Sequence, residues 1–180
     1  MNGNLELRLY GLVPYNLSPI QQGIQYGHSV QEYNNYIFEL IEDDAKGIEV
    51  TPDERREIYK FEQWRKEDKT FIILNGGTTN TNLDHLGTLN DHRLTLREHG
   101  IKIADFYEPD LGDQLTAVVF LVDERVFNRT KYPDYDGLFH GDGTPNAHDY
   151  TEWKLQFGTY QPDIEKIIFL REFLTNFKLA

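Results

Sequence analysis

Alternating apolar and polar residues predict a β-strand at the beginning of the chain. Over residues 5–13, Leu5, Leu7 and Leu9 recur at every second position, and this period is typical of a strand with one buried face. Further apolar runs bounded by turn residues predict a strand in each of three later segments: Phe71–Leu74, Ile101–Tyr107 and Leu115–Val122.

Helical spacing of apolar residues predicts the segments that connect these strands. Ser18 followed by Pro19 is a typical helix start, because the hydroxyl caps the first turn and proline fits the first helical position. The apolar spacing then continues to about Asp44. Thr51-Pro52 repeats this signal before a charged helix that extends to about Lys66. Two more helices are predicted, at about 80–99 and about 162–179, with a long loop at 131–151 between them.

The order of these elements predicts an α/β fold. The elements follow in the order strand, helix, helix, strand, helix, strand, strand. This order favours a small mixed four-stranded sheet with helices on both faces. We expect residues 1–123 to form this α/β domain. Residues 124–180 should add an aromatic loop and an amphipathic helix packed on the same domain.

Composition excludes several classes of protein. The chain has 180 residues, a net charge of −12 and no cysteine, so disulfides, thiol catalysis and cysteine-bound zinc are impossible. It contains no apolar run near the ~18 residues that span a bilayer, so we expect no membrane partner and a cytoplasmic location. The acidic balance also disfavours broad capture of nucleic acid, which depends on Lys and Arg.

The start of the first helix is the first candidate site. Gln21, Gln25 and His28 are spaced four and three residues apart and share one helix face. Gly23 and Gly27 are poor helix formers in the same turns. They indicate either the close approach of a ligand or another backbone, or simply tight packing of the helix beside a solvated polar face.

The turn before the last strand is the second candidate. Glu108, Asp110 and Asp113 lie within six positions. Acids in a turn are often only solvated. A carboxylate at a strand end, beside a helix that carries a histidine, could instead orient water or the imidazole.

The remaining histidines form no specific metal pattern. Three of them recur every seven residues on a predicted helix, where His85 and His99 would lie ~21 Å apart, so they indicate an exposed stripe. A second group in the long loop has irregular spacing, which makes a metal site there a weak alternative: His140, Asp142, His148 and Asp149. Neither a Walker loop nor a nucleophile elbow is present, and we expect no metal and no cofactor.

These motifs, taken in order, resemble the type II peptidyl-tRNA hydrolase family and its relatives of unassigned function. In that family the first helix opens with Ser-x-Gly-Lys-x-x-x-Gln-x-x-His, and Ser18, Gln25 and His28 fall at the matching spacing. The resemblance covers about residues 5–122 and looks most like divergent, including phage-encoded, members. Other features follow in the family's order: Trp64, the strand at 71–74, Glu108 or Asp110, and Thr116.

The sequence departs from the family pattern at its basic positions. Gln21 stands where the family has a lysine, Asn75 stands near a second family lysine, and Ile20 replaces the glycine. By resemblance, His28, Glu108 and Asp110 are the catalytic candidates. The expected substrate-binding residues are Ser18, Gln21, Gln25, Asn75 and Thr116.

Two functional hypotheses follow from the resemblance. The first is hydrolysis of the ester that joins a peptide to tRNA, which makes tRNA the partner despite the acidic charge. The second is an inactive relative that uses the same cleft to bind a nucleotide-like small ligand or a protein partner. The aromatic residues of the C-terminal region suit either a lid or an interface. Members of the family are often dimers, so the resemblance also makes a homodimer an alternative.

Overall fold

The fold is described from a computed structural model, which covers residues 5–82, 84–134, 140, 142, 144, 146–158 and 161–180. The chain divides into two compact units. The first contains residues 6–122 and 177–180. The second contains Leu5 and the described residues between Asp123 and Asn176. The last four residues therefore belong to the unit that holds the sheet.

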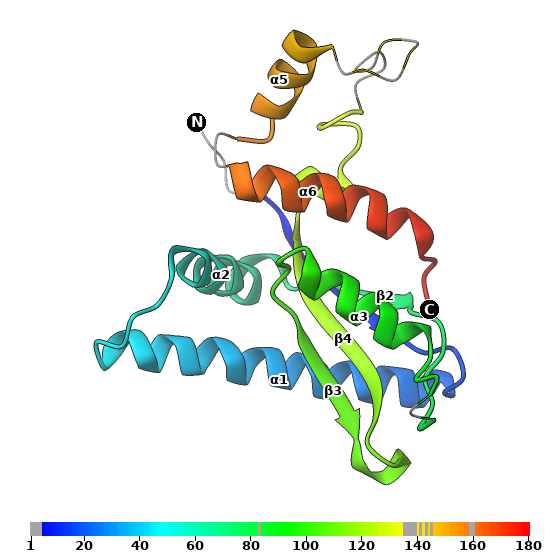
Figure 1. Cartoon of the computed structure of the whole chain (residues 1–180). Helices are drawn as coiled ribbons and strands as arrows, with labels where there is room; N and C mark the ends of the chain where they lie inside the picture. Colours follow the sequence, from blue (N-terminus) through cyan, green and yellow to red (C-terminus); the bar gives the residue numbers. More distant parts are fainter. Residues whose placement is uncertain are drawn as a thin grey trace. The chain divides into compact units, whose positions relative to one another are not determined.

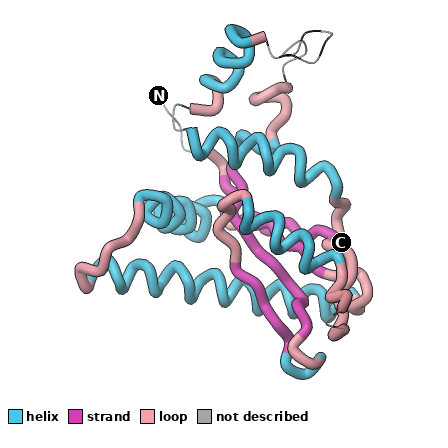
Figure 2. Tube along the Cα trace, viewed as in Figure 1, coloured by secondary structure: helices cyan, strands magenta, loops and turns pink. Residues whose placement is uncertain are grey.

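The four predicted strands form one open mixed sheet in the order β2-β1-β4-β3 (Figures 1 and 2). β1 and β2 are parallel, with Leu9 opposite Phe71, and β3 and β4 are antiparallel, with an irregularity between Phe106 and Tyr107. The prediction of a mixed four-stranded sheet is confirmed. The strands extend over Leu7–Val13 (β1), Thr70–Asn75 (β2), Ala104–Glu108 (β3) and Gln114–Asp123 (β4).

The helices of the first unit are α1 (Pro19–Ala45), α2 (Pro52–Gln63) and α3 (Thr88–Glu98). α1 and α2 both begin with a capping box, in which the side chains of residues Ncap and N3 satisfy each other's backbone N–H groups. α2 passes directly into a π-helical turn at Trp64–Asp68. This turn ends at Lys69, whose φ of 51° lies in the left-handed region.

Helices cover both faces of the sheet (Figure 1). On one face, the Tyr26 ring of α1 lies over Gly11 of β1, where a Cβ atom would come within 2.1 Å of it. The Tyr26 hydroxyl donates to the Leu9 carbonyl at 2.9 Å. Leu12 points to the other face and lies near Leu89 of α3, since a Cβ atom on Gly76 would meet both side chains at 2.8 Å.

Two predicted helix boundaries are wrong for local reasons. The third helix begins at Thr88 rather than near residue 80. The Asn80 and Asn82 side chains accept from backbone N–H groups two residues on, and such turns compete with helix formation.

The C-terminal helix, α6 (Gln161–Phe173), also ends earlier than predicted and is followed by a 3-10 turn at Leu174–Asn176. The final residues extend along the edge of β2. The Asn75 N–H donates to the Lys178 carbonyl at 2.9 Å, and the Ala180 N–H donates to Ile73 at 3.0 Å.

The second unit is held by a buried arginine on α6. Arg171 is 3% exposed and donates to the Arg125 carbonyl, the Tyr132 carbonyl and the Asp134 carboxylate at 2.7–2.8 Å. The unit also contains the short helix α4 (Glu124–Phe127) and α5 (Ala147–Leu155). The predicted loop therefore ends at Asn146 rather than at residue 151.

Three described aromatic residues of the second unit pack against one another. The rings of Tyr132 and Trp153 lie 6.2 and 4.8 Å from that of buried Phe157. Tyr135 and Phe139, which share the predicted loop, lie outside the described residues. Across the described ranges, no helix is long and apolar enough to cross a membrane.

Candidate functional site

Three side chains from separate segments form a hydrogen-bonded chain on the α1 face of the sheet. The Gln25 Nε2 donates to the Glu108 Oε2 at 2.6 Å, and the Thr116 hydroxyl donates to the Gln25 Oε1 at 2.7 Å. They come from α1, the end of β3 and β4. Both ends of the Gln25 amide are therefore engaged, which fixes its orientation.

The inner part of this chain is buried. Gln25 is 5% exposed and Thr116 is fully buried, and Thr116 also reaches the Phe106 carbonyl at 3.3 Å. A buried amide without partners would be costly. Gln25 therefore acts as a rigid link that holds the Glu108 carboxylate at one place on the surface.

Glu108 is kept ionised by donors to both of its oxygens. The hydrogen bond from Gln25 is the main cause that lowers the pKa of the Glu108 carboxyl, followed by the Asp110 N–H, which lies 3.3 Å from Oε1, and the nearby His28. Donors to a carboxylate favour its charged form. A half-exposed, ionised carboxylate oriented in this way can bind and orient water.

His28 completes the group. Its ring is exposed and stacks on Phe106, with the centroids 4.6 Å apart and the planes 16° from parallel. Gln25 and His28, three residues apart, lie on the same side of α1. Phe106 thus orients the imidazole beside Glu108, and it was not predicted because an aromatic residue in a strand usually signals only core packing.

The glycines of α1 do not serve helix packing. Gly23 and Gly27 are exposed, and a Cβ atom at either position would meet nothing within 4 Å. The alternative that they permit tight packing is therefore wrong. At 100° per residue both glycines lie on the flank of α1 opposite to Gln25, so the surface that they leave open is not beside the Glu108 group.

Ser18 and Gln21 cap α1 and do not join the Glu108 group. The Ser18 hydroxyl and N–H donate to the Gln21 Oε1 at 2.9 and 3.1 Å, while the Gln21 N–H donates back to the Ser18 Oγ at 3.3 Å. A lysine at position 21 could not accept these bonds. The predicted N-cap is confirmed, and the Ser-x-x-Gln spacing explains why Gln21 stands here.

Asn75 and Asp110 are also placed differently from the central group. Asn75 ends β2, at the opposite edge of the sheet from Glu108, about 14 Å away at three strand spacings. Its Oδ1 accepts from the Gly77 N–H at 3.0 Å. Asp110 touches Glu108 through its backbone N–H, and its side chain is exposed.

A further pair of residues holds the loops at this end of the sheet together. The Asn16 amide donates to the Thr79 carbonyl at 2.8 Å and accepts from the Thr79 N–H at 3.2 Å. The Thr79 hydroxyl donates to the Leu115 carbonyl next to Thr116. The start of β4 thus lies at the carboxyl ends of β1 and β2. The contacts of Thr79 join residues far apart in sequence, so no local sequence pattern predicts them.

The elements that form the site carry no lysine or arginine. The sequence has neither between Arg8 and Lys46, nor between Lys102 and Arg125, so the fixed charges from α1 and the β3–β4 turn are negative. Within the described side chains, no group of three His, Asp or Glu could hold a metal ion. The side chains of His148 and Asp149 lie outside that description.

The chain matches no protein-family model and no curated protein. The resemblance to the type II peptidyl-tRNA hydrolases therefore rests on the residues and their spacing.

Proposed function

We propose that the chain is an ester hydrolase of the peptidyl-tRNA hydrolase type, in which Glu108 activates water. The observation that supports this most is the ionised, half-exposed Glu108 carboxylate, held from inside by Gln25 and lying beside His28. These residues come from the two segments that carry the family resemblance.

In the proposed reaction, Glu108 takes a proton from a water molecule as the water oxygen attacks the ester carbonyl carbon. The ester C–O bond then breaks, and Glu108 returns the proton to the leaving ribose oxygen, so that the carboxylate is regenerated. His28 positions the substrate or the water. Gln25 and Thr116 are positioning residues, because their hydrogen bonds end on Glu108 and on each other.

The charge of the site favours recognition of the ester rather than of the tRNA body. Electrostatic capture of phosphates depends on Lys or Arg, and α1, β3 and β4, which carry the Glu108 group, supply none. We therefore expect the minimal substrate, a peptide esterified to the terminal adenosine, to be hydrolysed as well as the full peptidyl-tRNA. Its rate should also be nearly independent of salt concentration.

Turnover of both substrates by the full chain and its variants tests the proposal. Glu108→Gln should lower kcat/KM at least about 100-fold, the range for loss of general base catalysis. Asp113→Asn is the matched control, because Asp113 is an exposed acid of the same turn with a left-handed φ of 55° that asparagine tolerates. Absence of turnover, or equal turnover by Glu108→Gln, would overturn the proposal.

The predicted alternative is an inactive relative that binds a small ligand or a protein through the same cleft. It is favoured by the same hydrogen bonds, because donors that lower the pKa of Glu108 also make the carboxylate a weaker base. Peptidyl-adenosine that protects the chain from thermal unfolding without being hydrolysed would support it. The cytoplasmic location and a homodimer remain predictions.

A further inference from the structure

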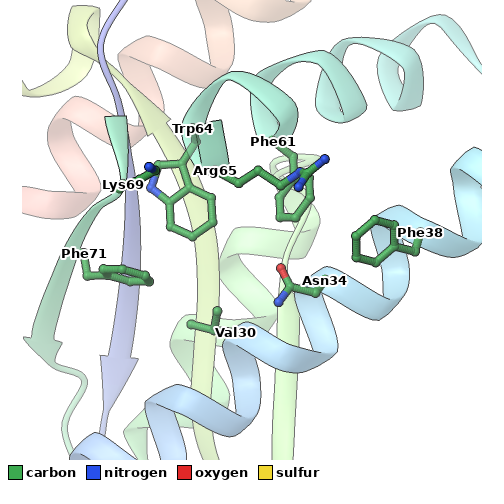
Figure 3. Close-up of a pocket in the computed structure, with 8 residues that line it drawn as sticks. All are labelled: Val30, Asn34, Phe38, Phe61, Trp64, Arg65, Lys69 and Phe71. Atoms are coloured by element: carbon green, nitrogen blue, oxygen red, sulfur yellow. The ribbon is translucent and has the colours of Figure 1, made fainter. Parts of the chain in front are cut away.

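An open hollow of about 460 Å³ lies in the first unit, beside the middle of α1 (Figure 3). Its lining comes from α1, from α2 and the π-helical turn that follows it, from Lys69 and from Phe71 of β2. Val30, Asn34 and Phe38 line it from α1 at intervals of four residues, so they share one helix face. At 100° per residue this face lies nearly opposite to that of Gln25 and His28.

A row of four aromatic rings forms one side of the hollow. Neighbouring ring centroids are 5.2 Å apart for Phe71 and Trp64, 6.0 Å for Trp64 and Phe61, and 6.2 Å for Phe61 and Phe38. Trp64 and Phe61 are buried. Phe71 and Phe38, at the two ends, are 51% and 46% exposed. The row therefore offers aromatic surface to a ligand, as Figure 3 shows.

The backbone at the rim is strained. Lys69 has a φ of 51°, and its N–H donates to the Trp64 carbonyl at 2.9 Å, which closes the π-helical turn. The Trp64 indole N–H donates to the Thr70 carbonyl at 3.0 Å. Left-handed backbone is unfavourable for lysine, and π-turns are frequent at functional sites. This turn places a fixed indole next to a lysine.

The polar residues of the lining suit an anion. Within the described part of the chain, Lys69 forms no ion pair and the Asn34 side chain forms no hydrogen bond. Arg65 lies on the same rim, but it is paired with Glu62 through bonds of 2.7 and 3.0 Å, so it contributes less net charge. Lys69 is therefore the main candidate for binding an anionic group.

We propose that this hollow binds a planar heteroaromatic ring that carries an anionic group, the chemistry of a mononucleotide. The volume lies within the range of small-molecule sites, about 300–1,000 Å³. The ring would stack on the exposed aromatic surface, and the anion would pair with Lys69 at the rim. This site is separate from the Glu108 group, and the proposal does not depend on hydrolysis.

Quenching of Trp64 fluorescence by AMP tests the proposal. The chain has two tryptophans, so the full chain with Trp153→Phe reports on Trp64 alone. Adenosine provides the same ring without the charge, and ribose 5-phosphate provides the charge without the ring. AMP should bind at least about fivefold more tightly than adenosine, the effect of one charge pair at about 4 Å in water. Ribose 5-phosphate should bind more weakly than either.

Two variants separate the contributions of the ring and the charge. Lys69→Gly removes the cation and at the same time relieves the left-handed strain, so it should keep or raise the thermal stability while AMP affinity falls to that of adenosine. Phe71→Ala should weaken AMP and adenosine equally. Lys46→Ala, at the exposed C-terminal end of α1, is the matched control and should leave AMP affinity unchanged.

Each result of these binding measurements either supports or overturns the proposed site. Equal affinity for AMP and adenosine, or unchanged AMP affinity in Lys69→Gly, would overturn the anionic part of the proposal. Absence of quenching by either ring-containing probe would overturn it entirely. Loss of peptidyl-ester hydrolysis in Glu108→Gln would leave these results unaffected, so the two proposals fail independently.

Discussion

The Glu108 carboxylate is held by a buried residue, Gln25. Gln25 is buried, yet its amide nitrogen lies 2.6 Å from the carboxylate and is the main cause of its lowered pKa. Since the donor favours the charged form, removing it should raise the pKa of Glu108 toward the ordinary value for glutamate. The contribution of Gln25 is thus measurable as a pH effect rather than only as a loss of activity.

Gln25→Leu should shift the acid limb of the pH profile of kcat/KM to higher pH. A lowered pKa keeps Glu108 ionised as the pH falls, so the wild type should remain active at lower pH than the variant. The Thr116 hydroxyl still donates to Phe106 in the variant, which limits the structural damage. Titration of the Glu108 carboxyl carbon by NMR should show the same shift without turnover.

Gln22→Leu is the matched control for this experiment. It makes the same chemical change about one helical turn before Gln25, where the Gln22 side chain donates to the Leu17 carbonyl at 2.9 Å. Its pH profile should match that of the wild type. An unshifted acid limb in Gln25→Leu, with the fold intact, would contradict the positioning role of Gln25.

At the scale of elements, α1 carries two different candidate sites on its two flanks. Its buried stripe of Tyr26, Tyr33 and Ile37 faces the sheet. At 100° per residue, Gln25 and His28 lie to one side of this stripe, and the residues of the aromatic hollow lie to the other. Because β3 and β2 are the two edges of the sheet, each flank of α1 meets a different edge.

The two exposed glycines of α1 and the glycine of β1 beneath it should respond oppositely to the same substitution. Gly23→Ala and Gly27→Ala should each stabilise the fold by about 0.5–1 kcal/mol, because the helix gains propensity and the new methyl group meets no neighbour. Gly11→Ala should destabilise by about 1–3 kcal/mol, because the Tyr26 ring occupies the position of the new Cβ atom.

Urea unfolding of the three variants measures this difference in sign. Destabilisation by Gly23→Ala or Gly27→Ala would contradict the open face of α1.

The elements were predictable wherever the signal is local, and the rest required tertiary contacts. The helix caps at Ser18 and Thr51 and the alternating strands depend on residues that are close in sequence, so the sequence predicts them. The extended C-terminus was not predictable in this way. Phe177 continues the helical apolar spacing of α6, and the extended conformation comes from hydrogen bonds with the edge of β2. The π-turn before Lys69 has no sequence signal either.

Some residues of the candidate site could be predicted from the sequence, and others could not. Gln25, His28, Glu108 and Thr116 were found from spacing and resemblance, and the structure brings them together. Ser18, Gln21 and Asn75 were assigned to the substrate, but their oxygens bind nearby backbone N–H groups. A spacing pattern cannot distinguish a side chain that binds a ligand from one that caps its own helix or turn.

At the scale of the whole molecule, the charge of −12 is unevenly distributed. α1, β3 and β4, which carry the Glu108 group, contain no lysine or arginine, whereas the rim of the aromatic hollow has Arg65 and Lys69. An anionic ligand should therefore prefer the hollow, and a substrate at Glu108 should be recognised by its ester group. The bulk charge alone could not separate these two surfaces.

The last residues of the chain pack against the unit that contains the sheet. Phe177 packs edge-on against His92 of α3, with ring centroids 4.8 Å apart, and the next residues pair with β2. Burial lowers the pKa of His92, with Asp91 acting in the opposite direction. The folded chain therefore keeps this imidazole neutral at a pH where the unfolded chain protonates it.

His92 should make the fold less stable in mild acid. Its stabilising effect is fully present above the unfolded pKa of about 6.5 and is lost as the pH falls toward the lower folded value, because the unfolded state then binds the extra proton. Unfolding free energies of the wild type and His92→Gln, measured between pH 7.5 and 5.5, should therefore converge as the pH falls. His85→Gln removes an exposed histidine instead and should keep the pH dependence of the wild type. Parallel curves for the wild type and His92→Gln would show that His92 does not couple the packing of Phe177 to protons.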